Sequence, residues 1–126
     1  MPDCRAPVAV FDSGLGGISV LRELVRTLPR ENYLYFGDSL HAPYGTKTPQ
    51  EVITLSLQAA DRLLSQGAKA LVVACNTATS AAIRTLRKTY PELAIVGTEP
   101  AIKPAVERHP GGRILMLATA MTVQEE

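Results

Sequence analysis

Five short runs rich in apolar and β-favouring residues recur along the chain, and segments with helical periodicity separate them. The runs cover residues 8–11, 32–38, 69–74, 93–97 and 113–118. Strands that alternate with helices build a parallel sheet, because each connection must cross one face of the sheet before the next strand begins. The alternation therefore predicts an α/β fold, a doubly wound parallel sheet with helices on both faces.

The segments between these runs carry helix signals at their ends. The clearest begins at Thr48, where Pro49 follows and Glu51 stands three residues on, the pattern of a capping box with proline at the first helical position. Gly67 marks the end of that helix. Further helices are expected over residues 17–28, 77–90 and 99–109.

Length and charge limit the classes of function. The chain has 126 residues and a formal net charge of +1, which fits one small domain and gives no basic surface for nucleic acid. No run is long enough to cross a membrane. The first residues include Asp3 and Arg5 and lack the apolar stretch of a signal peptide.

The cysteines and histidines carry no metal or disulfide pattern. Cys4 lies in an irregular N-terminal segment and Cys75 at the end of a strand, so the two form a poor disulfide framework. His41 and His109 do not match the spacing of a zinc site. We expect a reduced, cytoplasmic protein without a metal site.

Polar residues follow directly on the first and third strands. Asp12 and Ser13 come after the first, and Cys75, Asn76 and Thr77 come after the third. In open parallel sheets, ligands bind at the carboxyl ends of the strands. We therefore expect a site at this edge, whose donors suit a small substrate that carries a carboxylate.

The stretch "DSGLGG", residues 12–17, has two interpretations. Its glycines allow a sharp bend and close approach to a ligand, and the following helix offers free N–H groups to an anion. A dinucleotide fingerprint is excluded, because Ser19 stands where it requires glycine. The alternative is an ordinary strand-to-helix turn capped by Asp12 or Ser13.

Cys75 is the strongest candidate for chemistry. A thiol that ends a strand and directly precedes a helix lies at the positive end of the helix dipole, which favours the reactive thiolate. The alternative is a buried structural cysteine. Tyr44 and Gly45, in the loop over residues 39–47, could present a ring and backbone donors at the rim of the same crevice, or the tyrosine could simply pack.

Three long stretches match a known pattern in order and spacing. They are "FDSGLGGISVLREL" (11–24), "YFGDSLHAPYGTKT" (35–48) and "ALVVACNTATSAA" (70–82), and residues 96–105 and 118–123 extend the match. With these motifs the chain resembles the N-terminal portion of the aspartate/glutamate racemase family, and its wording is closer to the glutamate branch.

The resemblance implies a cofactor-independent isomerase that interconverts L- and D-glutamate and supplies D-glutamate for peptidoglycan, and hence for cell wall biogenesis and cell shape. The family uses two cysteines on opposite faces of the substrate Cα. Cys75 matches the first of these, and Asp12 matches the carboxylate that assists it. The positions that match substrate-binding residues are Asp12, Ser13, Tyr44, Gly45, Asn76 and Thr77.

The chain departs from the family in one respect. The second cysteine of the family lies in a "GCTHYP"-like stretch further downstream, and Cys4 matches no motif that could replace it. The resemblance implies that residues 1–98 form a first lobe and residues 99–126 only the start of a second. We expect no racemisation by the isolated chain, although it could exchange the α-proton of one enantiomer.

Several alternatives remain at this point. The chain could act on aspartate, or it could be a cysteine hydrolase or decarboxylase in which Cys75 works with His41 as base. It could also bind glutamate without catalysis. A homodimer that presents Cys75 from each copy is a further route to a two-thiol site.

Overall fold

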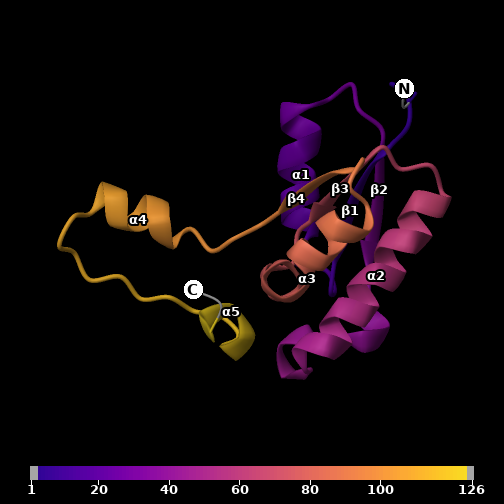
Figure 1. Cartoon of the computed structure of the whole chain (residues 1–126). Coiled ribbons are helices and arrows are strands. Elements are labelled where there is room, and N and C mark those ends of the chain that lie inside the picture. The colour runs from indigo at the N-terminus through magenta and orange to yellow at the C-terminus, as the bar shows by residue number, and fades with distance from the viewer. Residues whose placement is uncertain (1–2, 125–126) are drawn as a thin grey trace.

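A four-stranded parallel sheet forms the centre of the computed structural model, which describes residues 3–124 (Figure 1). The strand order is β2-β1-β3-β4. The strands are β1 (Val8–Asp12), β2 (Tyr33–Gly37), β3 (Ala70–Val73) and β4 (Ala94–Gly97), and every neighbouring pair is parallel. The predicted fold class is confirmed.

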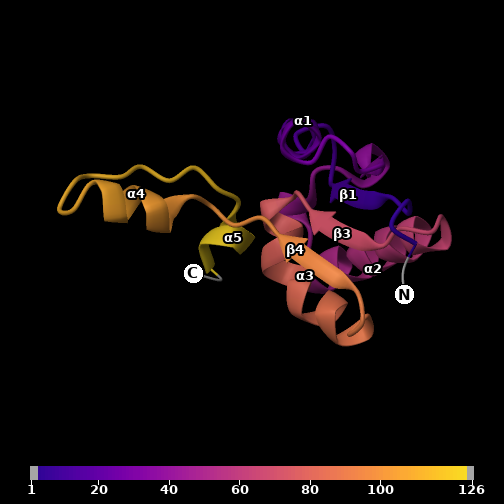
Figure 2. The same cartoon turned by 90° about the horizontal axis from the view of Figure 1, so that it is seen from above.

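Helices cover both faces of this sheet, but unequally. Figure 2 shows α1 (Ile18–Thr27) on one face and both α2 (Pro49–Ser65) and α3 (Asn76–Thr89) on the other. The main core lies on the α2–α3 side, where Phe11 and Val73 of the strands are fully buried. On the α1 side, no residue of α1 is buried, and Val96 of β4 is 57% exposed.

The start of α2 agrees with its sequence signal. The Thr48 hydroxyl accepts a hydrogen bond from the Glu51 N–H at 3.2 Å, and the Glu51 carboxylate accepts one from the Thr48 N–H at 2.7 Å. Pro49 occupies the first helical position. The Thr48 backbone N–H, which donates to the Glu51 carboxylate, and the nearby Thr48 hydroxyl lower the pKa of Glu51, because they stabilise its charged form.

The predicted strand over residues 113–118 is wrong. After β4 the chain forms a short helix, α4 (Ile102–Arg108), and then runs without regular structure to α5 (Ala120–Gln124). A strand needs a neighbour to accept and donate its backbone hydrogen bonds, and no described strand lies beside this segment. Leu115 and Leu117 are 86% and 88% exposed as a result.

The C-terminal segment leaves the sheet and then returns to it. In Figure 1, α4 and its flanking chain extend away from the sheet as an arm, and α5 lies back against α3. This return brings residues 117–122 to the carboxyl ends of the strands. Within residues 3–124, no helix is both long and apolar enough to cross a membrane.

Candidate functional site

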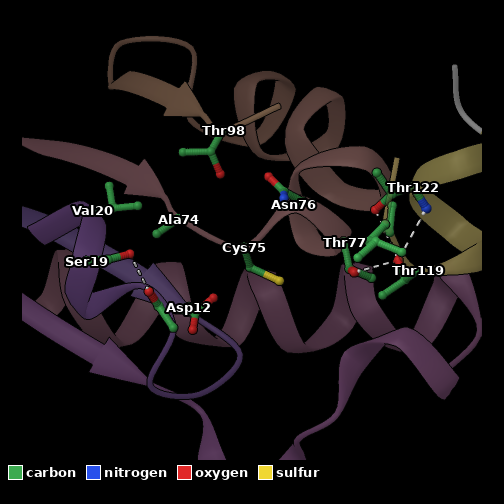
Figure 3. A pocket seen from close by; sticks show the side chains of 13 residues that line it. Asp12, Ser19, Val20, Ala74, Cys75, Asn76, Thr77, Thr98, Thr119 and Thr122 are labelled. Atoms are coloured by element: carbon green, nitrogen blue, oxygen red, sulfur yellow. Dashed lines mark hydrogen bonds between the residues drawn. The ribbon is translucent and has the colours of Figure 1, made fainter. Parts of the chain in front are cut away.

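A pocket of about 490 Å³ opens at the carboxyl ends of the strands, where the sequence predicts a site (Figure 3). The ends of β1 and β3, the start of α3 and the returning C-terminal segment form its wall. Its lining residues are Asp12, Gly16, Ser19, Val20, Ala74, Cys75, Asn76, Thr77, Thr98, Leu117, Ala118, Thr119 and Thr122.

Cys75 sits at the junction of β3 and α3. It is the N-cap residue of α3, and its sulfur accepts a hydrogen bond from the Ala78 N–H at 3.4 Å. The Ser13 hydroxyl lies 3.6 Å from the same sulfur. The residue is buried yet lines the pocket. The thiol thus lies at the N-terminus of a helix, at the end of a strand and beside a hydroxyl.

Asp12 serves both as a turn anchor and as a wall of the pocket. Its Oδ2 accepts hydrogen bonds from the N–H groups of Gly14 at 3.1 Å and Gly17 at 3.0 Å. A Cβ on Gly17 would lie 2.6 Å from the Cβ of Asp12, so this position requires glycine. The N-cap of α1 is Gly17, and no side chain caps this helix, so the interpretation of Asp12 or Ser13 as its cap is wrong. Asp12 instead holds the turn before α1, and its carboxylate is fixed beside the pocket.

Tyr35 contacts the same turn through its hydroxyl. The Tyr35 hydroxyl donates to the Gly14 carbonyl at 2.7 Å, on the outer side of the same turn. Burial of the phenol, together with the negative charge of Asp12, raises the pKa of Tyr35. The first turn of the site is thus held from both sides.

The structure places the side chain of Tyr44 in the core. Tyr44 is 1% exposed, its ring lies 6.1 Å from that of Phe11, and its hydroxyl donates to Asp38 Oδ2 at 2.6 Å. Burial and the Asp38 carboxylate raise the pKa of Tyr44. The packed-tyrosine interpretation is correct for the ring, and Tyr44 does not line the pocket.

His41 belongs to the Asp38 cluster rather than to the pocket. Its Nδ1 lies 2.8 Å from Asp38 Oδ1, and His41 does not line the pocket. Gly45 does reach the wall indirectly, because a Cβ at this position would lie 2.6 Å from the Thr119 methyl carbon. The turn around Gly45 is therefore packed directly against the returning C-terminal segment.

Two residues of the pocket wall, Thr119 and Thr122, were not predicted as site residues. The Thr119 hydroxyl lies 2.8 Å from that of Thr77 and 3.0 Å from that of Thr122, which joins the C-terminal segment to the start of α3. The available signal was the string "ATAMTV", which places small polar residues directly after an apolar run. These hydroxyls add donors and acceptors to the wall of the pocket.

Cys4, the other cysteine of this chain, lies at the opposite end of the sheet from Cys75. The Lys69 ammonium, just before β3, donates to the Cys4 carbonyl at 2.8 Å, whereas Cys75 follows the far end of that strand. The two residues therefore cannot act on one substrate in this chain. No three His, Cys, Asp or Glu side chains gather into a metal-binding group anywhere in residues 3–124.

Comparison with known proteins decides the family. Residues 9–126 match the family described as Asp/Glu/Hydantoin racemase. This chain belongs to the Asp/Glu/Hydantoin racemase family. The resemblance seen in the sequence motifs is confirmed.

Relatives within the racemase family share more than half of their aligned residues with the chain. It is 54% identical over 122 residues to the glutamate racemase of Clostridium perfringens, which covers 97% of this chain and 47% of that protein. It is 57% identical over 120 residues to the glutamate racemase of Clostridium botulinum, with 95% and 46% covered. The chain thus spans about half the length of the curated relatives it matches.

Solved racemase structures agree with the fold. The glutamate racemase of Thermus thermophilus, solved with β-chloro-D-alanine, is 44% identical with a TM-score of 0.81, over 98% of this chain and 47% of that one. The glutamate racemase of Escherichia coli, solved with L-glutamate and the activator UDP-MurNAc-Ala, is 35% identical with a TM-score of 0.86, over 94% and 45%.

Proposed function

We propose that this chain is the part of a glutamate racemase that carries one of its two proton-transfer thiols, Cys75. The observation that carries the proposal is the position of the Cys75 sulfur, inside the pocket and hydrogen-bonded by the Ala78 N–H at the start of α3. A thiolate held there is a base that can take the α-proton of a bound amino acid. Relatives and solved structures named glutamate racemase support the same reaction.

The substrate groups would be held by the donors around this thiol. The Asn76 and Thr77 side chains stand at the N-terminus of α3, where free N–H groups and the helix dipole favour a carboxylate. Ser13 and the backbone of the Tyr44–Gly45 turn complete the predicted binding set. Asp12 assists Cys75 as a fixed carboxylate.

The proposed reaction needs no cofactor. The thiolate removes the α-proton, which becomes the S–H proton, and leaves a carbanion that donors around the substrate carboxylate stabilise. Return of a proton from the opposite face would give the other enantiomer. D-Glutamate would then supply peptidoglycan synthesis in the cytoplasm, without a nucleic-acid or membrane partner.

We also propose that the chain divides near residue 98. The elements from β1 to β4 form the sheet and the helices that cover it, whereas α4 and its flanking chain extend away from it (Figure 1). Such an arm is consistent with the start of a second lobe.

Solvent exchange tests the function. The chain is incubated in D₂O with L- or D-glutamate, and the α-proton signal is followed by NMR. We expect exchange with retained configuration for one enantiomer, and no racemisation, because one thiol reaches one face of Cα. Cys75→Ala should abolish the exchange and Cys4→Ala should leave it intact; exchange that survives Cys75→Ala would refute the proposal.

The same assay separates the alternatives. Aspartate in place of glutamate tests the amino acid specificity. Calorimetry that detects glutamate binding, in a chain that shows no exchange, would favour a non-catalytic binding lobe. Hydrolysis with Cys75 and His41 is disfavoured, since His41 is paired with Asp38 outside the pocket.

A homodimer remains the other route to two thiols. Two chains would each contribute Cys75, and the pair would then racemise glutamate without a second cysteine in either chain. Sedimentation of the purified chain gives its mass in solution. Mixing Cys75→Ala with the wild-type chain would lower the racemase activity of such a dimer further than simple dilution does.

A further inference from the structure

Ser13 lies against the thiol of Cys75. Its Oγ is 3.6 Å from the sulfur, within hydrogen-bond reach for sulfur. The Ala78 N–H approaches the same sulfur at 3.4 Å from the helix. The sulfur therefore stands between one donor from α3 and one hydroxyl from the loop after β1.

The position of Ser13 is fixed by its neighbours. The adjacent Asp12 carboxylate is bound by the N–H groups of Gly14 and Gly17, which fixes the loop at the end of β1, and β1 pairs with β3. Among the described residues, the Ser13 hydroxyl has one hydrogen-bond partner, the Cys75 sulfur. The hydroxyl is thus held close to the sulfur and free to rotate its proton.

We propose that Ser13 stabilises the thiolate of Cys75 by donating its hydroxyl proton to the sulfur. In the neutral thiol, the S–H can donate to Ser13 Oγ. When the thiol loses its proton to solvent, the hydroxyl rotates and donates to the negative sulfur instead. A hydrogen bond to a charged group is stronger than one to a neutral group, so the Ser13 hydroxyl shifts the balance toward the thiolate.

This role differs from the substrate-binding role that the family resemblance implies for Ser13. A substrate-binding hydroxyl acts only when glutamate is present, whereas a thiolate donor acts in the free protein. The catalytic meaning of the inference rests on the proposed function. Its physical content, the reactivity of Cys75, can be measured without any substrate.

Alkylation by iodoacetamide tests the inference on the 126-residue chain. Mass spectrometry of the peptides follows Cys75 and Cys4 separately, and the exposed Cys4 serves as an internal reference. At pH 7 we expect Cys75 of Ser13→Ala to react roughly fivefold more slowly than in the wild type, because a donor to the thiolate is lost. Cys4 should react at the same rate in both proteins.

Two further variants separate this effect from a general disturbance. Ser13→Thr keeps the hydroxyl and should recover most of the rate. Ser39→Ala removes an exposed hydroxyl after β2, outside the pocket, and should change nothing. At a pH high enough to ionise Cys75 fully in both proteins, Cys75 of Ser13→Ala and Cys75 of the wild type should be alkylated at the same rate.

The outcomes decide the inference in either direction. Equal alkylation rates of Cys75 in Ser13→Ala and the wild type at pH 7 would overturn it. So would a slower rate in Ser13→Ala that persists at a pH where Cys75 is ionised in both proteins. Because no glutamate is present, these results do not depend on proton exchange at the substrate. A failed exchange assay with slowed Ser13→Ala alkylation would reject the racemase proposal alone.

Discussion

The hydroxyl of Tyr44 donates a hydrogen bond of 2.6 Å to the buried carboxylate of Asp38. His41 binds the same carboxylate from the solvent side. The pair ties the turn over residues 43–46 to the end of β2. Since Gly45 in this turn packs against Thr119, the Asp38–Tyr44 hydrogen bond also helps to position Thr119 in the pocket wall.

Removing the Tyr44 hydroxyl should destabilise the chain. Tyr44→Phe leaves a buried carboxylate with one donor fewer, and we expect a loss of about 2 kcal/mol in the free energy of unfolding. Urea titration followed by circular dichroism measures it. In a double-mutant cycle with Asp38→Asn, the two effects should not add; additive losses would contradict direct coupling.

The tyrosines predict a loss of stability at alkaline pH. Burial and Asp38 raise the pKa of Tyr44, and burial and Asp61 raise the pKa of Tyr90 to about 12. A tyrosine of the unfolded chain ionises near pH 10, so it loses its proton before the folded one does. The stabilisation is complete below about pH 10 and is lost as pH rises further.

The free energy of unfolding, measured in urea between pH 8 and pH 11, should therefore fall with increasing pH at the alkaline end. Tyr44→Phe should make that fall less steep, because one proton-linked group is removed. Tyr90→Phe offers a partly exposed comparison with a smaller effect on the slope. A slope unchanged by Tyr44→Phe would show that this phenol does not contribute.

Two glycines of the first turn should respond differently to the same substitution. A Cβ on Gly17 would lie 2.6 Å from that of Asp12, whereas a Cβ on Gly14 would meet nothing within 4 Å. Gly17→Ala should cost about 1–3 kcal/mol of stability through overpacking. Gly14→Ala should stay within about 0.5 kcal/mol of the wild type.

The Gly17→Ala change should also displace the Asp12 carboxylate, since Gly17 both donates to it and touches it. Urea denaturation compares the two variants, and the Asp12 carboxyl signal in an NMR spectrum reports its environment. Equal losses of stability at Gly14 and Gly17 would argue against the close approach.

Gly45 and Thr119 give a test of the contact behind the pocket. Gly45→Ala places a methyl 2.6 Å from the Thr119 methyl carbon, and should push the returning segment away from α3. We expect faster hydrogen exchange over residues 117–124. Thr119→Ser removes the methyl and keeps the hydroxyl bound to Thr77, so the double variant should recover much of the protection.

The strands and the predicted site edge were accessible from sequence because their signals are local. The capping box at Thr48 depends on residues three apart, and the site edge depends on what directly follows each apolar run. Such signals depend on residues that are close in sequence, so they do not require knowledge of contacts between distant segments. They led to the family, the parallel sheet, and the pocket position of Asp12 and Cys75.

The errors concern contacts between distant parts of the chain. Residues 113–118 have the composition of a strand, yet a strand also requires a neighbour that composition does not supply. The direction of the Tyr44 ring depends on Phe11, which lies in β1, and on Asp38, which directly follows β2. The place of Thr119 beside Thr77 depends on the return of the C-terminal arm.

The hydroxyl contact between Thr77 and Thr119 joins residues that are 42 positions apart. During synthesis from the N-terminus, β1 to β4 and their helices leave the ribosome before Thr119 does. The sheet and its main core can therefore form while one wall of the pocket has not yet been made. We expect the pocket to be the last part of the described chain to assemble, and ligand binding to begin only when residues 117–122 have docked.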